Sequence, residues 1–217
     1  MKKNNVLNKK MARYTLLAGA AITLLASCSK DDDPETETND PNIDETDLTP
    51  DLSLTPAMNA GAMDSIDLNG DGIYDMAVGA YNYNYTYGGV TSAVNYGYIT
   101  GMNGAEVLTE EEIVNFDGYI DTVEVVSALG EGNTIGASQV TWFDEAYLGA
   151  SGTYNGSPIS FGKFLGQDKF VGLKFPVSGN SHYAWVRLSM SADGSNVMIK
   201  EYAYHVTPNT AIVAGDK

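Results

Sequence analysis

The feature that most constrains the fold is a two-residue alternation of side chains near the C-terminal end of the chain. In residues 183–190 apolar side chains occupy every second position, and residues 170–175 repeat the pattern. This period places alternate side chains on opposite faces of a β-strand. Residues 191–195 read Ser-Ala-Asp-Gly-Ser, which is typical of a turn, and residues 197–204 follow as a partner strand. We therefore expect three consecutive antiparallel strands.

Residues 56–217 as a whole favour an all-β domain. Short runs of aromatic and β-branched residues are separated by glycine, and no long stretch has helical periodicity. The segment is long enough for one domain with a core and short for two. We expect a single β-sandwich, jelly-roll-like, because that architecture covers both faces of many short strands.

One short exception is expected at residues 109–112. Thr109 and Glu112 have the spacing of a capping box, in which each side chain satisfies a backbone donor near the other. This predicts one helical turn and explains three consecutive glutamates without a catalytic role.

The segment before the domain has a different composition. Between Asp31 and Asp51 lie ten acidic residues, no basic residue and three prolines, with almost nothing apolar. Such a segment cannot bury enough apolar surface to fold, so we expect residues 28–55 to be a disordered acidic linker. As a self-repelling coil it could hold the domain on the order of 30 Å from its point of attachment.

The N-terminal segment has the pattern of a secretory signal. Five cations lie within the first 13 residues, and an apolar run extends from Tyr14 to Ala26. The run is too short to cross a hydrocarbon core, which needs roughly 20 residues. We expect residues 1–27 to be a removable signal peptide, whose loss changes the formal net charge from −16 to −21.

The apolar run leads directly into Cys28, the chain's single cysteine. Residues 25–28, Leu-Ala-Ser-Cys, resemble the lipobox of bacterial lipoproteins, in which the signal is cut before the cysteine and the cysteine is acylated. Residues 30–32, Lys-Asp-Asp, resemble the export signal of Bacteroidota-type surface lipoproteins. The resemblance implies a lipoprotein held by palmitate-type chains at Cys28 in the outer membrane and facing the cell exterior, an anchor that several chains make stable. An ordinary secretory signal beside a chance cysteine is the alternative.

The strongest chemical motif is a loop of alternating oxygen-bearing residues. Asp67, Asn69, Asp71, the carbonyl of Ile73, and Asp75 occupy positions one, three, five, seven and nine, and glycines permit a tight curl. The pattern resembles the calcium loops of dockerins, thrombospondin type 3 repeats and integrin-type propellers, although it lacks the glutamate at position twelve of an EF-hand. We expect a structural calcium ion; the alternative is an Asx-rich turn without metal.

The loop and the C-terminal strands together resemble a group of secreted and surface-lipoprotein β-domains. The residues that carry this resemblance are the aspartate and asparagine loop, residues 171–175, residues 182–188 and the Tyr-Ala-Tyr of residues 202–204. No reaction is assigned to the group, so the resemblance implies a fold and little about function.

A tyrosine-rich stretch is the best candidate for a binding surface. Tyr81, Tyr83, Tyr85 and Tyr87 alternate with polar residues. Tyr96 and Tyr98 follow at the same spacing after two glycines. Flat amphipathic rings suit a glycan or a protein partner because they offer a large contact area with little rotamer entropy to lose. The alternative is that one tyrosine face packs inward.

Signatures of common enzyme classes are missing from the sequence. A carboxylate pair for glycoside cleavage could still form in space from Asp117, Asp121, Glu124, Asp144 or Glu145. His182, His205, Trp142 and Trp185 are interpreted as packing residues. From residue 52 onward six basic residues face eighteen acidic ones, which argues against nucleic acid as a partner.

The sequence therefore predicts a lipid-anchored, calcium-stabilised module that binds a glycan or a protein, or that has a structural role. Two alternatives remain. A surface glycoside hydrolase or another carbohydrate-active enzyme would place two carboxylates roughly 5 to 9 Å apart in a cleft. An accessory subunit of an outer-membrane assembly would expose a broad apolar patch.

Overall fold

The computed structural model describes residues 40–217, and within that range it contains strands, turns and loops but no helix. The strands are β1 (Ile43–Leu54), β2 (Gly61–Ile66), β3 (Met76–Tyr87), β4 (Val90–Gly101), β5 (Glu106–Phe116), β6 (Tyr119–Val126), β7 (Thr134–Ile135), β8 (Trp142–Phe143), β9 (Glu145–Tyr154), β10 (Ser157–Phe161), β11 (Asp168–Val177), β12 (Asn180–Met190), β13 (Val197–His205) and β14 (Ile212–Val213). The prediction of an all-β, sandwich-like domain is confirmed.

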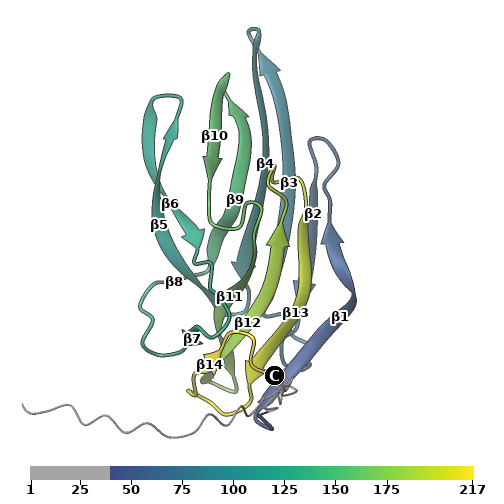
Figure 1. Ribbon diagram of the computed structural model, residues 1–217, viewed down its shortest axis with the longest axis vertical. Coiled ribbons are helices and arrows are strands. Elements are labelled where there is room, and N and C mark those ends of the chain that lie inside the picture. The colour runs from purple at the N-terminus through teal and green to yellow at the C-terminus, as the bar shows by residue number, and fades with distance from the viewer. Residues whose placement is uncertain (1–39) are drawn as a thin grey trace, which may run out of the picture. The chain divides into compact units, whose positions relative to one another are not determined.

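Twelve of these strands belong to one sheet with the order β1-β13-β12-β11-β5-β6-β9-β4-β3-β2, while β10 pairs with β9 and β8 pairs with β5. The sheet bends until its two outermost strands, β1 and β2, come close to each other, so it nearly closes (Figure 1). The main core lies between its two halves. Val78 and Ile99 from one half and Val186 and Ile199 from the other have no solvent exposure in this core.

The three C-terminal strands form as the alternation predicts. Strand β12 pairs antiparallel with β11 and with β13. Ala184, Val186 and Leu188 face the main core and are fully buried. Trp185, on the opposite face of β12, is buried as well, because the short β7–β14 pair brings Ile135 and Ile212 over it. The strand is therefore covered on both faces, which simple alternation does not reveal.

The predicted linker ends earlier than the sequence suggested. Residues 43–54, which we assigned to a disordered linker, form β1 and pair antiparallel with β13 from Ile43 opposite His205 to Leu54 opposite Val197. The pairing is interrupted between Asp47 and Leu52, around Pro50. The prediction was wrong here because β1 is an outermost strand, where acidic side chains remain solvated and a proline removes no essential hydrogen bond.

The predicted helical turn at residues 109–112 is also wrong. These residues lie within β5, where Thr109 is opposite Val126 and Glu112 is opposite Val123. Alternate residues of a strand lie on the same face, so Glu110 and Glu112 point to one side of β5, where Lys163 forms ion pairs with both. Pairing with a neighbouring strand has overridden the local capping signal.

The described chain has two distinct ends. The β3–β4, β5–β6 and β9–β10 hairpins reach the upper end in Figure 1. At the lower end the backbone N–H of Asp40 donates to the carbonyl of Lys217, so the chain enters the domain beside its C-terminal residue. The signal peptide and the lipidation site Cys28 lie outside the described residues. No element of residues 40–217 is a helix capable of spanning a membrane.

Candidate ligand groove and candidate metal loop

The tyrosine-rich stretch forms the β3–β4 hairpin. Gly88 and Gly89, both with positive φ, make its two-residue turn and place Tyr87 opposite Val90. This register puts Tyr81 opposite Tyr96 and Gly79 opposite Tyr98, so the six predicted tyrosines share one face of the sheet. The face is the outer one, because Val78 and Ala80 on the other face are buried in the main core.

The two expectations for these tyrosines each hold for part of the hairpin. Near the base, the rings of Tyr81 and Tyr96 stack with centroids 5.3 Å apart, and both are half-buried. Toward the turn the rings become exposed, with Tyr85 at 53% and Tyr87 at 77% of full exposure. The tyrosine rings near the tip of the hairpin are therefore exposed to solvent, whereas those near its base pack against each other.

A second hairpin covers part of this outer face. Strands β5 and β6 fold over β9 and β10, and Val114, Val125, Ala150, Ile159 and Phe161 form a separate buried cluster between them. Phe116 extends the cluster through edge-on contacts with the rings of Tyr154 and Phe161, at centroid distances of 5.9 Å and 6.1 Å. The cluster leaves a furrow beside it, which we call the tyrosine groove.

The tyrosine groove consists of three adjoining hollows. The middle hollow, about 240 Å³, is lined by Tyr83, Val94, Tyr96, Phe116, Val123, Tyr147, Ala150, Tyr154, Ile159 and Phe161. The tip hollow, about 550 Å³, is lined by Tyr83, Tyr85, Tyr87, Val90, Ser92, Asp117, Tyr154 and Asn155. The lower hollow, about 140 Å³, is lined by Tyr98, Val123, Glu124, Glu145, Ala146 and Tyr147. Neighbouring hollows share lining residues and are therefore adjacent.

The groove contains three of the five carboxylates that the sequence suggested for catalysis. Glu124 and Glu145 line the lower hollow and Asp117 lines the tip hollow, whereas Asp121 and Asp144 line none of the three. The hydroxyl of Thr109 donates to Glu124 at 3.1 Å. Within residues 40–217 neither Glu124 nor Glu145 forms an ion pair, so both can accept hydrogen bonds from a ligand.

Tyr96 is one of the residues that line the middle hollow. Burial raises the pKa of its phenol, and the neighbouring Tyr147, Tyr81, Tyr98 and Glu145 raise it further. The hydroxyl therefore stays protonated at neutral pH and is available as a hydrogen-bond donor.

The residues of the predicted calcium loop connect β2 to β3. Asp67 accepts hydrogen bonds from the backbone N–H groups of Gly70 and Gly72, at 2.8 Å and 2.7 Å. The side chain of Asn69 accepts from the N–H of Asp71 at 3.1 Å, and Asp71 accepts from the N–H of Ile73 at 2.8 Å. The chain is thus curled around its own side-chain oxygens.

Asp75 closes the loop. Its carboxylate accepts the backbone N–H of Leu68 at 2.8 Å, and only 5% of the residue is exposed. Burial raises the pKa of Asp75 to about 6, and the nearby charges of Asp67 and Asp71 add to the increase, while the hydrogen bond from Leu68 opposes it. A buried carboxylate beside two others is costly to ionise, and a bound cation would relieve that cost.

The donor set fits calcium in part. Carboxylate, amide and carbonyl oxygens are the ligands that calcium takes, and the left-handed glycines Gly70 and Gly72 allow the curl. However, no group of three or more His, Cys, Asp or Glu side chains among the described residues has an arrangement ready to hold a metal. Asp67, Asn69 and Asp71 are engaged with backbone donors, so metal binding requires them to share or exchange these partners.

The loop also sets where β3 begins. The N–H of Asp75 bonds to the carbonyl of Ile66, and the N–H of Met102 bonds to the carbonyl of Asp75. Met76, the first residue of β3, is fully buried, as are Val78 and Ala80. The apolar face of β3 therefore begins at Met76, whereas Tyr74 remains in the loop and is exposed.

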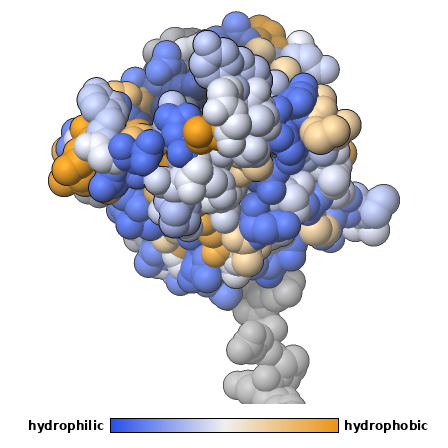
Figure 2. Space-filling view, turned by 90° about the horizontal axis from the view of Figure 1, so that it is seen from above, coloured by the Kyte–Doolittle hydropathy of each residue, from blue (hydrophilic) through white to orange (hydrophobic). Residues whose placement is uncertain are grey.

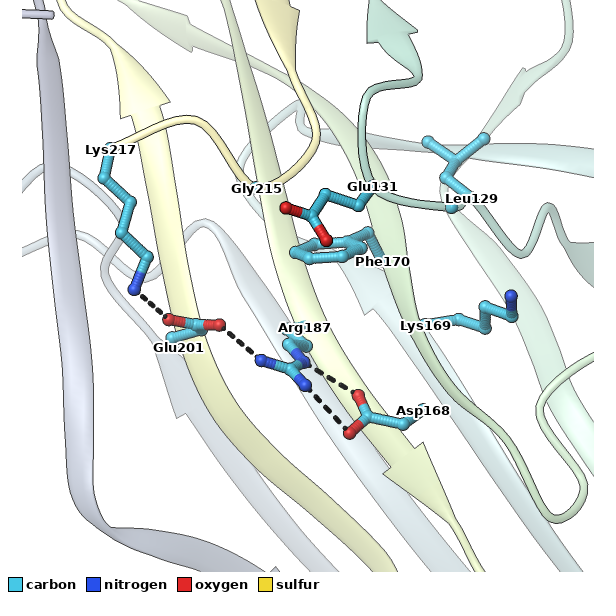
Figure 3. A pocket seen from close by; sticks show the side chains of 10 residues that line it. Leu129, Glu131, Asp168, Lys169, Phe170, Arg187, Glu201, Gly215 and Lys217 are labelled. Carbon is cyan, nitrogen blue, oxygen red and sulfur yellow. Dashed lines mark hydrogen bonds and ion pairs between the residues drawn. The ribbon is translucent and has the colours of Figure 1, made fainter. Parts of the chain in front are cut away.

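A further hollow, about 320 Å³, lies on the other half of the sheet and was not anticipated from the sequence (Figure 3). Arg187 lies in it between two carboxylates: its Nε donates to Asp168 at 2.9 Å and one terminal nitrogen donates to Glu201 at 3.0 Å. Lys217 extends the chain of charges from Glu201, at 2.8 Å, to Glu45 on β1.

The charges of Asp168, Arg187, Glu201 and Lys217 satisfy one another. Burial would raise the pKa of Glu201, but hydrogen bonds from Lys217 and Arg187 outweigh it and hold that pKa below its ordinary value. The pKa of Arg187 is raised by its hydrogen bonds to Asp168 and Glu201. The network joins β1, β13, β12 and β11, and we interpret it as a structural clamp.

The remaining predicted packing residues behave largely as expected. His182 is buried, and its Nδ1 lies 2.9 Å from the carbonyl oxygen of His205. Trp185 is fully buried and its indole N–H donates to the carbonyl of Asp216, whereas Trp142 is half-buried and donates to the carbonyl of Gln139.

Comparison with protein-family models, curated proteins and solved structures found no match to this chain.

Proposed function

We propose that the protein is a lipid-anchored binding module of the outer cell surface, with the tyrosine groove as its ligand site. The observation that carries this proposal is the exposed tyrosine face at the end of the domain opposite to the entry of the chain beside Lys217. A tether attached before Asp40 would join the domain at the end opposite to the hairpin tips and so leave the groove accessible from outside. A module that captures ligands from outside the cell requires that orientation.

The anchor in this proposal is the acylated Cys28, and its test is cellular. In the native host the wild-type chain should fractionate with outer membranes and be degraded when intact cells are treated with protease. Cys28→Ser should release the chain into soluble fractions. A soluble wild-type protein would contradict the anchor, and membrane-bound protein protected from external protease would contradict surface exposure.

The second part of the proposal is a structural calcium ion in the loop from Asp67 to Asp75. Support comes from the alternating oxygen donors and from the buried carboxylate of Asp75. Calcium should raise the thermal midpoint of the wild-type chain, because a ligand bound by the native state stabilises it. Asp71→Ala should abolish the calcium-dependent rise, whereas Asp121→Ala, an exposed acid of β6, should retain it. An equal midpoint with calcium and with chelator would reduce the loop to a turn.

The ligand site is tested with Tyr83→Ala. Tyr83 lines both the middle and the tip hollows, so its removal affects the groove at its centre. The matched control is Tyr119→Ala, because Tyr119 is 66% exposed on the neighbouring hairpin but lines none of the three hollows. On an array of glycans, peptides and lipids, Tyr83→Ala should weaken binding and Tyr119→Ala should not. If Tyr83→Ala and Tyr119→Ala had equal effects on binding, or if nothing on the array bound, the tyrosine groove would not be the ligand site.

One observation favours a second candidate function. Glu124 and Glu145 come from different strands and line the same lower hollow, as an acid and a base of a glycoside hydrolase would. Release of reducing sugar from oligosaccharides, lost in both Glu124→Gln and Glu145→Gln, would favour the enzyme. Unchanged oligosaccharides after long incubation would leave binding as the function.

The accessory-subunit alternative has less support. Figure 2 views the hairpin end from above, and its apolar residues lie in small separate groups between hydrophilic ones. A stable protein interface usually has a more continuous apolar centre.

A further inference from the structure

The tyrosine groove is elongated, which limits the shape of its ligand. Tyr83 and Tyr154 belong to both the tip and the middle hollows, and Val123 and Tyr147 belong to both the middle and the lower ones. Along β4 the lining extends from Val90 in the tip hollow to Tyr98 in the lower one. At the usual rise of a strand this distance is about 26 Å. A chain of several units fits such a furrow better than one compact molecule does.

The exposed part of the lining consists mainly of ring faces with hydrogen-bonding groups beside them. The rings of Tyr85 and Tyr87 are nearly parallel, with an interplanar angle of 7° and centroids 6.5 Å apart. In the same hollow Asn155 and Asp117 provide amide and carboxylate groups, and Asp117 also accepts from the hydroxyl of Ser157 at 2.7 Å. A pyranose ring has apolar C–H faces that pack on aromatic rings and hydroxyls at its edge that need such polar partners.

The charge of the groove limits the ligand further. No lysine or arginine lines any of the three hollows, whereas Asp117, Glu124 and Glu145 do. Sulfated or uronic-acid sugars would meet carboxylates and find no cation to pair with. The hydroxyls of a neutral sugar can donate to the same carboxylates.

The position of the groove argues against an extended peptide. A peptide that binds by adding a strand needs a free sheet edge. The groove lies instead on the face of β4, which is paired with β3 on one side and with β9 on the other. The backbone of β4 therefore has no free row of hydrogen-bonding groups for a peptide.

We propose that the tyrosine groove binds a neutral oligosaccharide chain that lies along β4, stacks on Tyr85 and Tyr87 at the tip, and donates hydroxyl hydrogen bonds to Glu145 in the lower hollow. This inference rests on the proposed function, because it names the ligand of the same site. It makes the length of the sugar chain a determinant of affinity, since a short sugar reaches only one hollow.

The experiment is isothermal titration of the purified full-length protein, saturated with calcium, with neutral gluco-, manno- and xylo-oligosaccharides of increasing length. At least one series should bind, with an affinity that rises with length and then levels off. Tyr87→Ala should weaken the longest binding member of that series about tenfold, the loss expected for one stacked ring. Tyr119→Ala should leave its affinity unchanged. Because the ligand is uncharged, added salt should have little effect.

A second variant separates the two ends of the groove. Glu145→Gln should weaken long members of the series and leave the shortest binding member unaffected, because that member occupies the tip hollow. Tyr87 and Glu145 are both exposed. Tyr87→Ala and Glu145→Gln should therefore fold, and an unchanged thermal midpoint will show that they do.

Other outcomes overturn the inference in distinguishable ways. Binding of uronic-acid oligosaccharides or basic peptides that still depends on Tyr83 would exclude a neutral sugar and leave the ligand site intact. Neutral-sugar binding independent of chain length would exclude the extended pose. If no glycan, peptide or lipid binds through Tyr83, the proposed function fails together with this inference.

Discussion

The ring of Tyr98 lies directly over Gly79, its partner across β3 and β4, and fills the space that a side chain at position 79 would need. The tyrosine hydroxyl donates weakly to the sulfur of Met63 at 3.8 Å. Because Tyr98 also lines the lower hollow, the glycine helps to shape the groove.

Gly79→Ala should therefore displace the tyrosine ring. We expect a loss of roughly 1 to 3 kcal/mol in the free energy of unfolding, measured by chemical denaturation, because the added carbon overlaps ring atoms. Gly130→Ala is the matched control, since its nearest neighbouring atom is 3.9 Å from the added carbon. Combining Gly79→Ala with Tyr98→Leu should cost less than the two changes summed; strict additivity would show that the ring is not the obstacle.

Asp75 should make the calcium-free protein more stable at mildly acidic pH. Its pKa is raised to about 6 in the folded state from an ordinary value of 3.8, so folding favours the protonated form. Stability from this group is greatest below 3.8 and falls as the pH rises through about 6. In chelator, the free energy of unfolding of the wild type should fall by roughly 1 kcal/mol between pH 5 and pH 7, and its thermal midpoint should fall with it.

Asp75→Asn should flatten that profile, because the amide keeps an acceptor for the N–H of Leu68 without a titrating charge. Calcium should reverse the trend, since a metal binds the ionised carboxylate and is favoured as the pH rises. An equal slope in the wild type and the variant would assign the pH dependence to another group.

Arg187→Met should make the fold less stable at neutral pH and its stability less dependent on pH in the acid range. The change removes the hydrogen bonds to Asp168 and Glu201 and leaves the mostly buried Glu201 with Lys217 as its remaining partner. We expect a loss of about 3 kcal/mol at pH 7, measured by denaturant unfolding. Lys163→Met, which breaks an exposed pair with Glu110, should cost less than about 1 kcal/mol.

The sign of the acid dependence follows from the lowered pKa values of Asp168 and Glu201. Their ion pairs stabilise the fold above the ordinary carboxyl pKa and are lost as the pH falls through the lowered folded values. The wild type should lose this stability at low pH, and the difference between the wild type and Arg187→Met should shrink there. A constant difference down to pH 2 would contradict the clamp.

Strand β1 should be essential for folding. Leu52 and Leu54 pack on the main core, and Glu45 forms an ion pair with Lys217. A chain that starts at residue 40 should unfold cooperatively, whereas one that starts at residue 56 should show a much lower midpoint or none, by circular dichroism. Similar midpoints for the two chains would mean that residues 43–54 contribute little to stability, as expected of a linker.

The parts of the fold that the sequence predicts are those with local signals. The alternation at residues 183–190 and the turn at residues 191–195 lie within one segment, and β12 and β13 form where they indicate. Strand β1 was missed because its charges and proline resemble those of a linker, and its pairing with β13 is more than 140 residues distant in sequence. The composition of residues 43–54 indicates that they do not fold alone, but it does not reveal that β13 supplies their hydrogen-bond partners.

In the candidate site, too, the features with a local sequence signal were predicted and those formed by distant segments were not. The tyrosine pattern and the loop from Asp67 to Asp75 were visible as spacings. The groove was not, because β4, β6 and β9 contribute to its walls and only the folded sheet brings Glu124 and Glu145 to the same hollow. The clamp around Arg187 was missed for a related reason: its partners Asp168 and Glu201 lie on neighbouring strands, and charges on strands carry no pattern that distinguishes a pair from a solvated face.

The direction of β1 has a mechanical consequence. Its first residues pair with the end of β13 at the base of the domain, and its last residues point toward the hairpins. A pull between an N-terminal anchor and a ligand held at the tips would run along the strands, so the β1–β13 hydrogen bonds would share the load instead of opening one by one. A domain loaded in this way resists tension between its N-terminal end and the hairpin tips.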